Sequence, residues 1–196
     1  IGRCFEEAFL KAWASLEQGA PHPRPLTRAD ESEGEGMAER AFEQLPDNVL
    51  IDWLRIATDR RMGAVIEAFR RGWSIERVHE ITRITRWFLY GFQRIANVEN
   101  EIVARACSPR DLTADELRKW KSFGFSDGHI ADALSGFPTT GLKELAESKS
   151  EQAVMKSRHG HAVHPIFRMV DSCAAEFAAK TPYYYSTYEP YGDNRI

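Results

Sequence analysis

The densest group of metal-capable side chains in this sequence is a histidine run near residue 160. His159, His161 and His164 lie close together, and Cys173 follows nine residues beyond the last of them. Imidazole and thiolate groups are the ligands that zinc prefers, but this spacing matches no standard zinc pattern and no second cysteine follows. We therefore interpret the run as a solvated loop that leads into a strand, and a metal site is the less favoured alternative.

Other residues with chemical potential also lack the partners that a reaction needs. Ser172 has no Gly-x-Ser-x-Gly elbow around it, and Cys173 has no identifiable base, so a structural cysteine is the better interpretation. The acidic pair Glu6 and Glu7 is expected on a helix surface. The glycines are dispersed, and none forms the glycine-rich turn that cradles phosphates. The sequence therefore predicts no catalytic, metal-binding or cofactor-binding residue.

The composition is that of a soluble globular chain. Of the 196 residues, 43% are hydrophobic, and 26 Lys and Arg against 29 Asp and Glu leave a net charge of −3. A slightly negative net charge argues against a dedicated nucleic-acid binder. No apolar run approaches the ~20 residues that span a bilayer. Three scattered cysteines suit a reducing compartment such as the cytoplasm. Because the chain opens on Ile1 without Met, we expect it to be a piece of something larger.

The hydrophobic periodicity predicts an all-α fold, an irregular helical bundle with an extended C-terminal linker arm. Apolar residues recur at helical spacing in most of the chain, whereas residues 19–36 are rich in proline and acidic residues and form a linker. The expected helices cover residues 5–16, 37–44, 48–56, 60–70, 74–81, 86–105, 113–123, 126–134 and 142–158, and a short strand is expected at 166–170. Apolar residues of the first helix form one stripe: Phe5, Ala8, Phe9, Ala12, Trp13 and Leu16.

Two helical corners in this pattern resemble each other. Residues 71–78 and 123–130 each read as a helix end, a glycine, an aromatic residue and then Ser74 or Ser126 as the cap of a new helix. Glycine turns the chain because it lacks the penalty of the left-handed conformation, and serine restarts the hydrogen bonding. Thr113 and Glu116 form a further helix-starting signal, a capping box.

Such corners raise a helix-turn-helix alternative, with a nucleic-acid-binding or regulatory role for residues 74–94. The would-be recognition helix begins with bulky apolar groups, and residues 72–105 contain five Arg against four Glu. Without a cationic stripe, counterion release contributes little to DNA binding. We therefore keep this function as the alternative and expect no nucleic-acid partner and no membrane contact.

Aromatic residues favour a protein interface instead, since Trp and Tyr are common at interface centres. The alternative is that each aromatic residue only packs in the hydrophobic core. We expect a self-association face around residues 87–92 and the two corners. The candidate interface residues are Trp73, Trp87, Phe88, Tyr90, Phe92 and Phe125.

Several motifs resemble the large subunit of carbamoyl-phosphate synthase. Residues 171–177 look like the family's D-T-C-A-A-E-F, residues 181–189 like its T-P-Y-Y-Y-S-T-Y-E, and residues 1–8 like its I-G-R-T-F-E-E-A. Shorter matches fall in the expected order between them, at 68–72, 87–89 and 124–127. Departures are Cys4 and Ser172 in place of threonines, a poor match at 151–164, and an apparent insertion or divergent linker at 19–48. Losing the threonine at position 4 predicts a weaker cap on the first helix.

The resemblance implies a domain plan. Residues 1–18 would end the first synthetase domain, residues 19–48 would be the linker or insertion, 49–160 the helical oligomerisation domain, and 161–196 the extended linker toward the second synthetase domain. Residues 183–188 would run against that second domain and are expected to be poorly ordered without it.

The resemblance also implies a function. The parent would be an ATP-dependent carbon–nitrogen ligase that uses Mg or Mn, and it would make carbamoyl phosphate from bicarbonate and glutamine-derived ammonia for arginine and pyrimidine synthesis. A glutaminase small subunit and the two synthetase halves would be partners, together with further copies of the chain. This piece would itself be a non-catalytic structural and oligomerisation module, and the family's catalytic residues match no position here.

Overall fold

A computed structural model of the chain describes residues 1–16, 46–59, 61–136, 143–170 and 183–189. The linker expected at 19–36, the helix expected at 37–44 and the motif at 171–177 lie outside the described residues. Within them the prediction of an all-α fold is confirmed, since helices account for nearly all of the regular structure.

The elements begin and end close to where the sequence places them. Helices are α1 (Phe5–Ala14), α2 (Asp47–Arg55), α3 (Arg61–Arg70), α4 (Ile75–Thr82), α5 (Arg86–Arg105), α6 (Ala114–Ser122), α7 (Asp127–Leu134) and α8 (Lys143–Gly160). A short 3-10 turn, η2 (Pro109–Asp111), follows α5, and the strands are β1 (Ile166–Met169) and β2 (Tyr184–Thr187).

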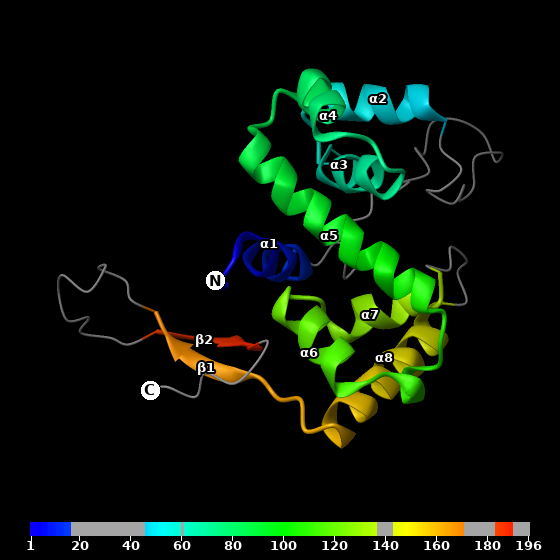
Figure 1. Ribbon diagram of the computed structural model, residues 1–196, viewed down its shortest axis with the longest axis vertical. Coiled ribbons are helices and arrows are strands. Elements are labelled where there is room, and N and C mark those ends of the chain that lie inside the picture. Colours follow the sequence, from blue (N-terminus) through cyan, green and yellow to red (C-terminus); the bar gives the residue numbers. More distant parts are fainter. Residues whose placement is uncertain (17–45, 60, 137–142, 171–182, 190–196) are drawn as a thin grey trace.

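The long helix α5 runs through the molecule and organises the others around it (Figure 1). Helices α2, α3 and α4 gather at one end of α5, and α6, α7 and α8 gather at the other. Helix α1 packs against α5 between the two groups, and the β1–β2 ribbon extends to one side below α1. One hydrophobic core extends through both groups, from Leu50 in α2 to Val154 in α8.

Both predicted corners are confirmed in detail. Gly72 (φ +78°) and Gly124 (φ +97°) adopt the left-handed conformation. The amide after each glycine donates to a carbonyl five residues earlier, from Trp73 to Ala68 and from Phe125 to Trp120. This is the Schellman geometry, which satisfies carbonyl groups at a helix end. The two aromatic side chains are buried, so each corner is anchored in the core.

Predicted helix starts also agree with the structure. Ser74 and Ser126 accept hydrogen bonds from the amides three residues later, and Thr113 and Glu116 form both halves of the capping box. Cys4 stands before α1 and makes no side-chain cap hydrogen bond, as expected from its replacing a threonine. Local side-chain chemistry therefore explains where α4, α6 and α7 begin.

The buried face of helix α1 differs from the predicted one. Leu10 is buried and Leu16 is half exposed, although Leu16 belongs to the predicted stripe. The prediction that Glu6 and Glu7 lie on the surface is wrong, because both carboxylates are buried. Helix α1 turns the face with Glu6, Glu7 and Leu10 toward the rest of the molecule. Glu6 pairs with Arg94 of α5, and Glu7 pairs with Lys11 of α1 itself.

The C-terminal arm is also more ordered than expected. Strands β1 and β2 pair antiparallel, with Ile166 opposite Thr187 and Met169 opposite Tyr184. The expectation of a poorly ordered segment at 183–188 is therefore wrong, since Thr187 is buried against the helical part of the chain. The strand predicted at 166–170 is confirmed, and the arm folds back on α1.

Candidate interaction surface

An exposed aromatic surface lies where the first turns of α5 meet α1. Trp87 is 62% exposed, Tyr90 is 49% exposed and Phe88 is 44% exposed. We call these three residues the aromatic patch. Phe5 of α1 lies beneath it, with its ring centroid 5.7 Å from those of both Trp87 and Phe88.

Helical geometry explains why these side chains face outward. Leu89 and Phe92, three residues apart, form the inward face of the first turns of α5 and are buried. Tyr90 lies on the outward face, and the Trp87 ring meets the neighbouring Phe88 ring at 5.0 Å in an edge-to-face arrangement. Exposed side chains that are this large and adjacent are typical of an interaction site.

The six interface residues predicted from the sequence therefore divide into two sets. Trp87, Phe88 and Tyr90 are exposed together on α5. Trp73, Phe92 and Phe125 are buried inside this chain, where they anchor the corners and the contact between α1 and α5. The patch on α5 is thus the part of the predicted face that another molecule can reach.

A buried ionic cluster joins the two helix groups. Glu99 of α5 is fully buried and accepts from the Arg70 guanidinium of α3 and from His129 Nε2 of α7, the latter at 2.7 Å. Glu67 of α3 lies 3.2 Å from the same guanidinium. Because a carboxylate oxygen only accepts, His129 Nε2 carries the proton in this pair.

The charge states of Glu99 and His129 follow from their burial and from the groups that they contact. Burial acts to raise the pKa of the Glu99 carboxyl, but Arg70 and His129 outweigh it and hold that pKa below its usual range. Burial lowers the pKa of His129, and the attraction of Glu99 does not fully offset it. The structure therefore holds a charged glutamate and favours a neutral histidine at the junction of α3, α5 and α7.

A second polar cluster holds the C-terminal arm against α1. Glu7 accepts from the Arg3 amide and from Lys11 Nζ, each at 2.8 Å. Arg3 also donates to Thr187 Oγ1 and to the Tyr188 carbonyl, each at 3.1 Å, and Lys11 donates to the Ser186 carbonyl. Burial acts to raise the pKa of Glu7, but the hydrogen bonds from Lys11, Arg3 and Thr187 hold it below its usual value. We call this group the α1–β2 clamp.

Tyr188 extends the same attachment to α6 and α8. Its ring lies 5.1 Å from Lys121 Nζ and 5.7 Å from the Arg158 guanidinium, which is within cation–π range. Both cations also pair with Asp127, at 2.9 Å and 3.0 Å. The end of β2 therefore contacts α1, α6 and α8 together.

Sequence reasoning missed these two clusters, although one signal was present. Glu99 lies four residues after Ile95 and three before Ile102, so it shares their buried face of α5. A carboxylate on an apolar helix face needs a partner, and this pattern indicates a buried pair. Nothing local identified Arg70 or His129 as the partners, because they come from elements far away in the sequence.

The histidine run does not assemble a site for a metal among the described residues. His159 and His164 have ring centroids 5.4 Å apart, and His161 Nε2 contacts the Leu112 carbonyl at 2.8 Å. No group of three metal-ligating side chains occurs in the described part of the chain. Ser172 and Cys173, weighed above as nucleophiles, lie outside the described residues. No described helix is long and apolar enough to cross a membrane.

The fold and these surfaces define a class: a helical domain with an exposed aromatic surface. Comparison with known proteins identifies its relatives. The family "Carbamoyl-phosphate synthetase large chain, oligomerisation domain" matches residues 1–162. The chain belongs to this family of oligomerisation domains.

Two curated relatives support the assignment. One is the N-terminal section of the carbamoyl phosphate synthase large chain of Aquifex aeolicus, 38% identical over 97% of this chain and 29% of the relative. Another is the arginine-specific large chain of carbamoyl phosphate synthase from Halalkalibacterium halodurans, 36% identical over 93% of this chain and 16% of the relative. The chain thus spans less than a third of the length of either relative. Because the family is one of oligomerisation domains, the helix-turn-helix alternative is not favoured.

Proposed function

We propose that this chain is the structural, self-associating segment of an ATP-dependent carbon–nitrogen ligase that makes carbamoyl phosphate. Its relatives are named as large chains of that enzyme, and it spans only a fraction of their length. In this proposal the parent reaction uses bicarbonate, glutamine-derived ammonia and ATP with Mg or Mn in the cytoplasm. Catalysis resides outside this segment, and the segment carries the contact between copies.

The observation that carries the self-association proposal is the aromatic patch. Its three side chains are large and adjacent, and they stand on a helix whose opposite face is fixed in the core. Removing such rings from water stabilises a complex by about 25 cal/mol per Å² of apolar area. A specific dimer hides roughly 1,200–2,000 Å² in total, so the patch would form the centre of a wider contact. Because the family is defined as an oligomerisation domain, the proposed occupant is a second copy of this chain.

The test is the oligomeric state of the 196-residue chain and its variants, measured by sedimentation equilibrium. Trp87→Ser and Tyr90→Ser are each expected to raise the dissociation constant roughly tenfold or more, since aromatic residues at interface centres commonly contribute 1–2 kcal/mol or more. Phe167→Ser is the matched control, because Phe167 is also highly exposed but lies on β1. Thermal unfolding checks that all three variants fold.

Two results would contradict the proposal. One is a chain that stays monomeric at high micromolar concentration. The other is a loss of association in Phe167→Ser with none in Trp87→Ser. If the isolated chain is monomeric while hydrogen exchange shows the patch protected in the full-length large chain, the occupant is another part of the same protein.

A second role in the proposal is to hold neighbouring parts of the enzyme at a fixed separation. The α1–β2 clamp supports it, since residues near position 3 and residues near position 187 are bonded to each other. By the expected domain plan these residues adjoin the first and second synthetase halves. The glutaminase small subunit would be a further partner of the assembled enzyme and has no proposed contact on this segment.

A further inference from the structure

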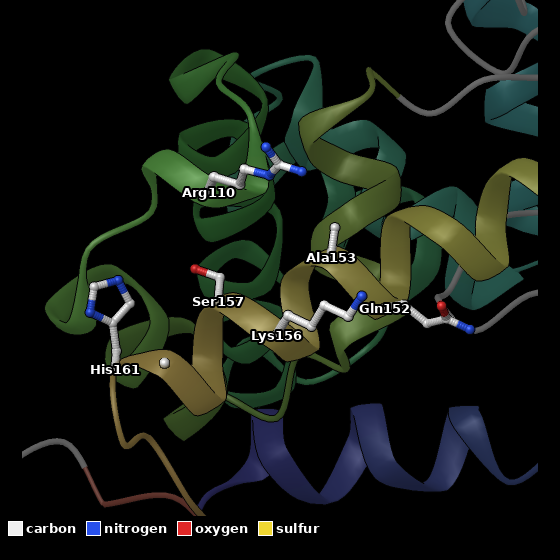
Figure 2. A pocket seen from close by; sticks show the side chains of 7 residues that line it. Arg110, Gln152, Ala153, Lys156, Ser157 and His161 are labelled. Carbon is white, nitrogen blue, oxygen red and sulfur yellow. The ribbon is translucent and has the colours of Figure 1, made fainter.

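A hollow between η2 and the last turns of α8 is lined by two cationic side chains and, among the described residues, by no carboxylate. It has a volume of about 600 Å³ and is lined by Arg110, Gln152, Ala153, Lys156, Ser157, Gly160 and His161 (Figure 2). Pockets that hold small molecules fall in the range of about 300–1,000 Å³. None of the lining residues is acidic.

The cations of this hollow differ from most others in the described chain. Most described arginine and lysine side chains pair with carboxylates, as Arg105 does with Glu116 at 2.7 Å. Arg110 and Lys156 are exposed, and neither makes an ion pair within the described residues. Glu116 is engaged by Arg105 and by the Thr113 amide, so it is not free to neutralise the hollow.

Two further groups at the hollow can form hydrogen bonds. His161 donates from Nε2 to the Leu112 carbonyl at 2.8 Å, which leaves Nδ1 as its other polar atom. Ser157 Oγ is buried and has no hydrogen-bond partner in the described part of the chain. A buried hydroxyl without a partner costs free energy, so a rotation of this side chain toward a bound oxygen would be favourable.

The charge of α8 itself does not explain the arrangement. Basic side chains in the last turn of a helix interact favourably with the helix dipole, and in α8 these are Arg158 and His159, not Lys156. Arg110 belongs to η2 and lines the same hollow from another part of the chain.

We propose that this hollow is a binding site for a small oxyanion with two or more negative charges, either phosphoryl or carboxylate. Arg110 supplies a planar guanidinium that can hold two oxygens, and Lys156 supplies a point charge from the facing helix. Ser157 and His161 complete the polar lining. The site is separate from the aromatic patch, so it does not depend on self-association.

The test is titration of the 196-residue chain with inorganic pyrophosphate and, in parallel, with succinate, by calorimetry at low ionic strength. Saturable binding of one or both is expected, and comparing the two identifies the preferred class of oxyanion. Arg110→Gln and Lys156→Gln should each weaken binding roughly tenfold, as the loss of a charge-assisted hydrogen bond does. Lys119→Gln is the control, since Lys119 is an exposed lysine that pairs with Glu101 away from the hollow.

Two results would contradict the proposal of an oxyanion site. One is the absence of saturable binding of either anion at millimolar concentration. Another is equal weakening by Lys119→Gln and Lys156→Gln, which would mean that the anion senses only general surface charge. Chemical shifts of the α8 and η2 amides on adding pyrophosphate give a second readout, and they should move before any others.

Discussion

Glu99 shows how a single buried carboxylate can join two groups of helices. It contacts Arg70 from α3 and His129 from α7; Glu99 and His129 are buried, and the Arg70 side chain is 9% exposed. Removing one member of a buried pair leaves an uncompensated charge, which is more costly than the pair itself is stabilising. The junction of α3, α5 and α7 should therefore be sensitive to changes at this one residue.

Glu99→Gln is expected to lower the free energy of unfolding by roughly 3 kcal/mol, because Arg70 would lose its principal partner inside the core. Urea unfolding followed by circular dichroism measures the change. Glu80→Gln is the control, since Glu80 is exposed on α4 and its replacement should cost within about 0.5 kcal/mol. Equal effects of the two substitutions would show that the cluster does not stabilise the fold.

His129 gives the protein a pH-dependent stability. Its pKa is lowered by burial in the native state, so the unfolded chain binds a proton more readily below the ordinary histidine pKa of about 6.5. The stability is fully present above that value and declines as pH falls toward the native pKa. Unfolding free energies between about pH 7 and pH 5.5 should show this slope, and His129→Gln should flatten it. His159→Gln, at an exposed position, is the control.

Among the elements, the two glycine corners have the same backbone geometry but different surroundings. At Gly72 an added Cβ would meet no atom within 4 Å, whereas at Gly124 it would lie 2.7 Å from the Glu7 Cα of α1. Gly124 is thus required both for its left-handed conformation and for the close approach of α1 to the corner between α6 and α7.

Gly72→Ala and Gly124→Ala form a matched pair for separating these two requirements. Gly72→Ala should cost roughly 1–2 kcal/mol, the penalty of the left-handed conformation alone. Gly124→Ala should cost about 1–3 kcal/mol more, because α1 must move to admit the methyl group. Denaturant unfolding gives both values. A Gly124→Ala variant no less stable than Gly72→Ala would show that α1 adjusts freely.

The elements also show what sequence reasoning can and cannot predict. Ser74, Ser126 and Thr113 act on amides three residues away, so the sequence alone places the starts of α4, α7 and α6. The burial of Glu6 depends on Arg94, 88 residues away in the sequence, and no local pattern identifies that partner.

The same limit applies to the candidate site. Tertiary packing decides which aromatic residues are buried, so the sequence indicated a contact face but could not separate exposed Trp87 from buried Phe92. Order in the C-terminal arm likewise depends on β1 and α1, which residues 183–188 do not reveal by themselves.

At the scale of the whole molecule, the α1–β2 clamp connects parts that are far apart in the chain. Lys11 bonds both to Glu7 within α1 and to the Ser186 carbonyl of β2, so it is central to the attachment. Thr187 and Tyr188 add contacts with Arg3, and Tyr188 with α6 and α8. This arrangement makes the ribbon part of the helical body.

Lys11→Met should loosen this attachment while leaving the core intact. Amides of residues 184–187 are expected to exchange with deuterium faster in this variant. In the unchanged protein, local opening of β2 must break the hydrogen bond from Lys11 to the Ser186 carbonyl, and the variant lacks that bond. Exchange in α3 and α5 should not change. Mass spectrometry of peptides measures both, with Lys119→Met on α6 as the comparison. Unaltered exchange of β2 would mean that the strand pairing alone holds the arm.

Helix α5 is an unbroken run of 20 residues, which corresponds to a rod about 30 Å long. Its first turns carry the aromatic patch and its middle carries Glu99, so a molecule bound at Trp87 is rigidly connected to α3 and α7. Docking at that end would therefore also set the direction in which the far helices point, and two docked copies would share a single fixed orientation.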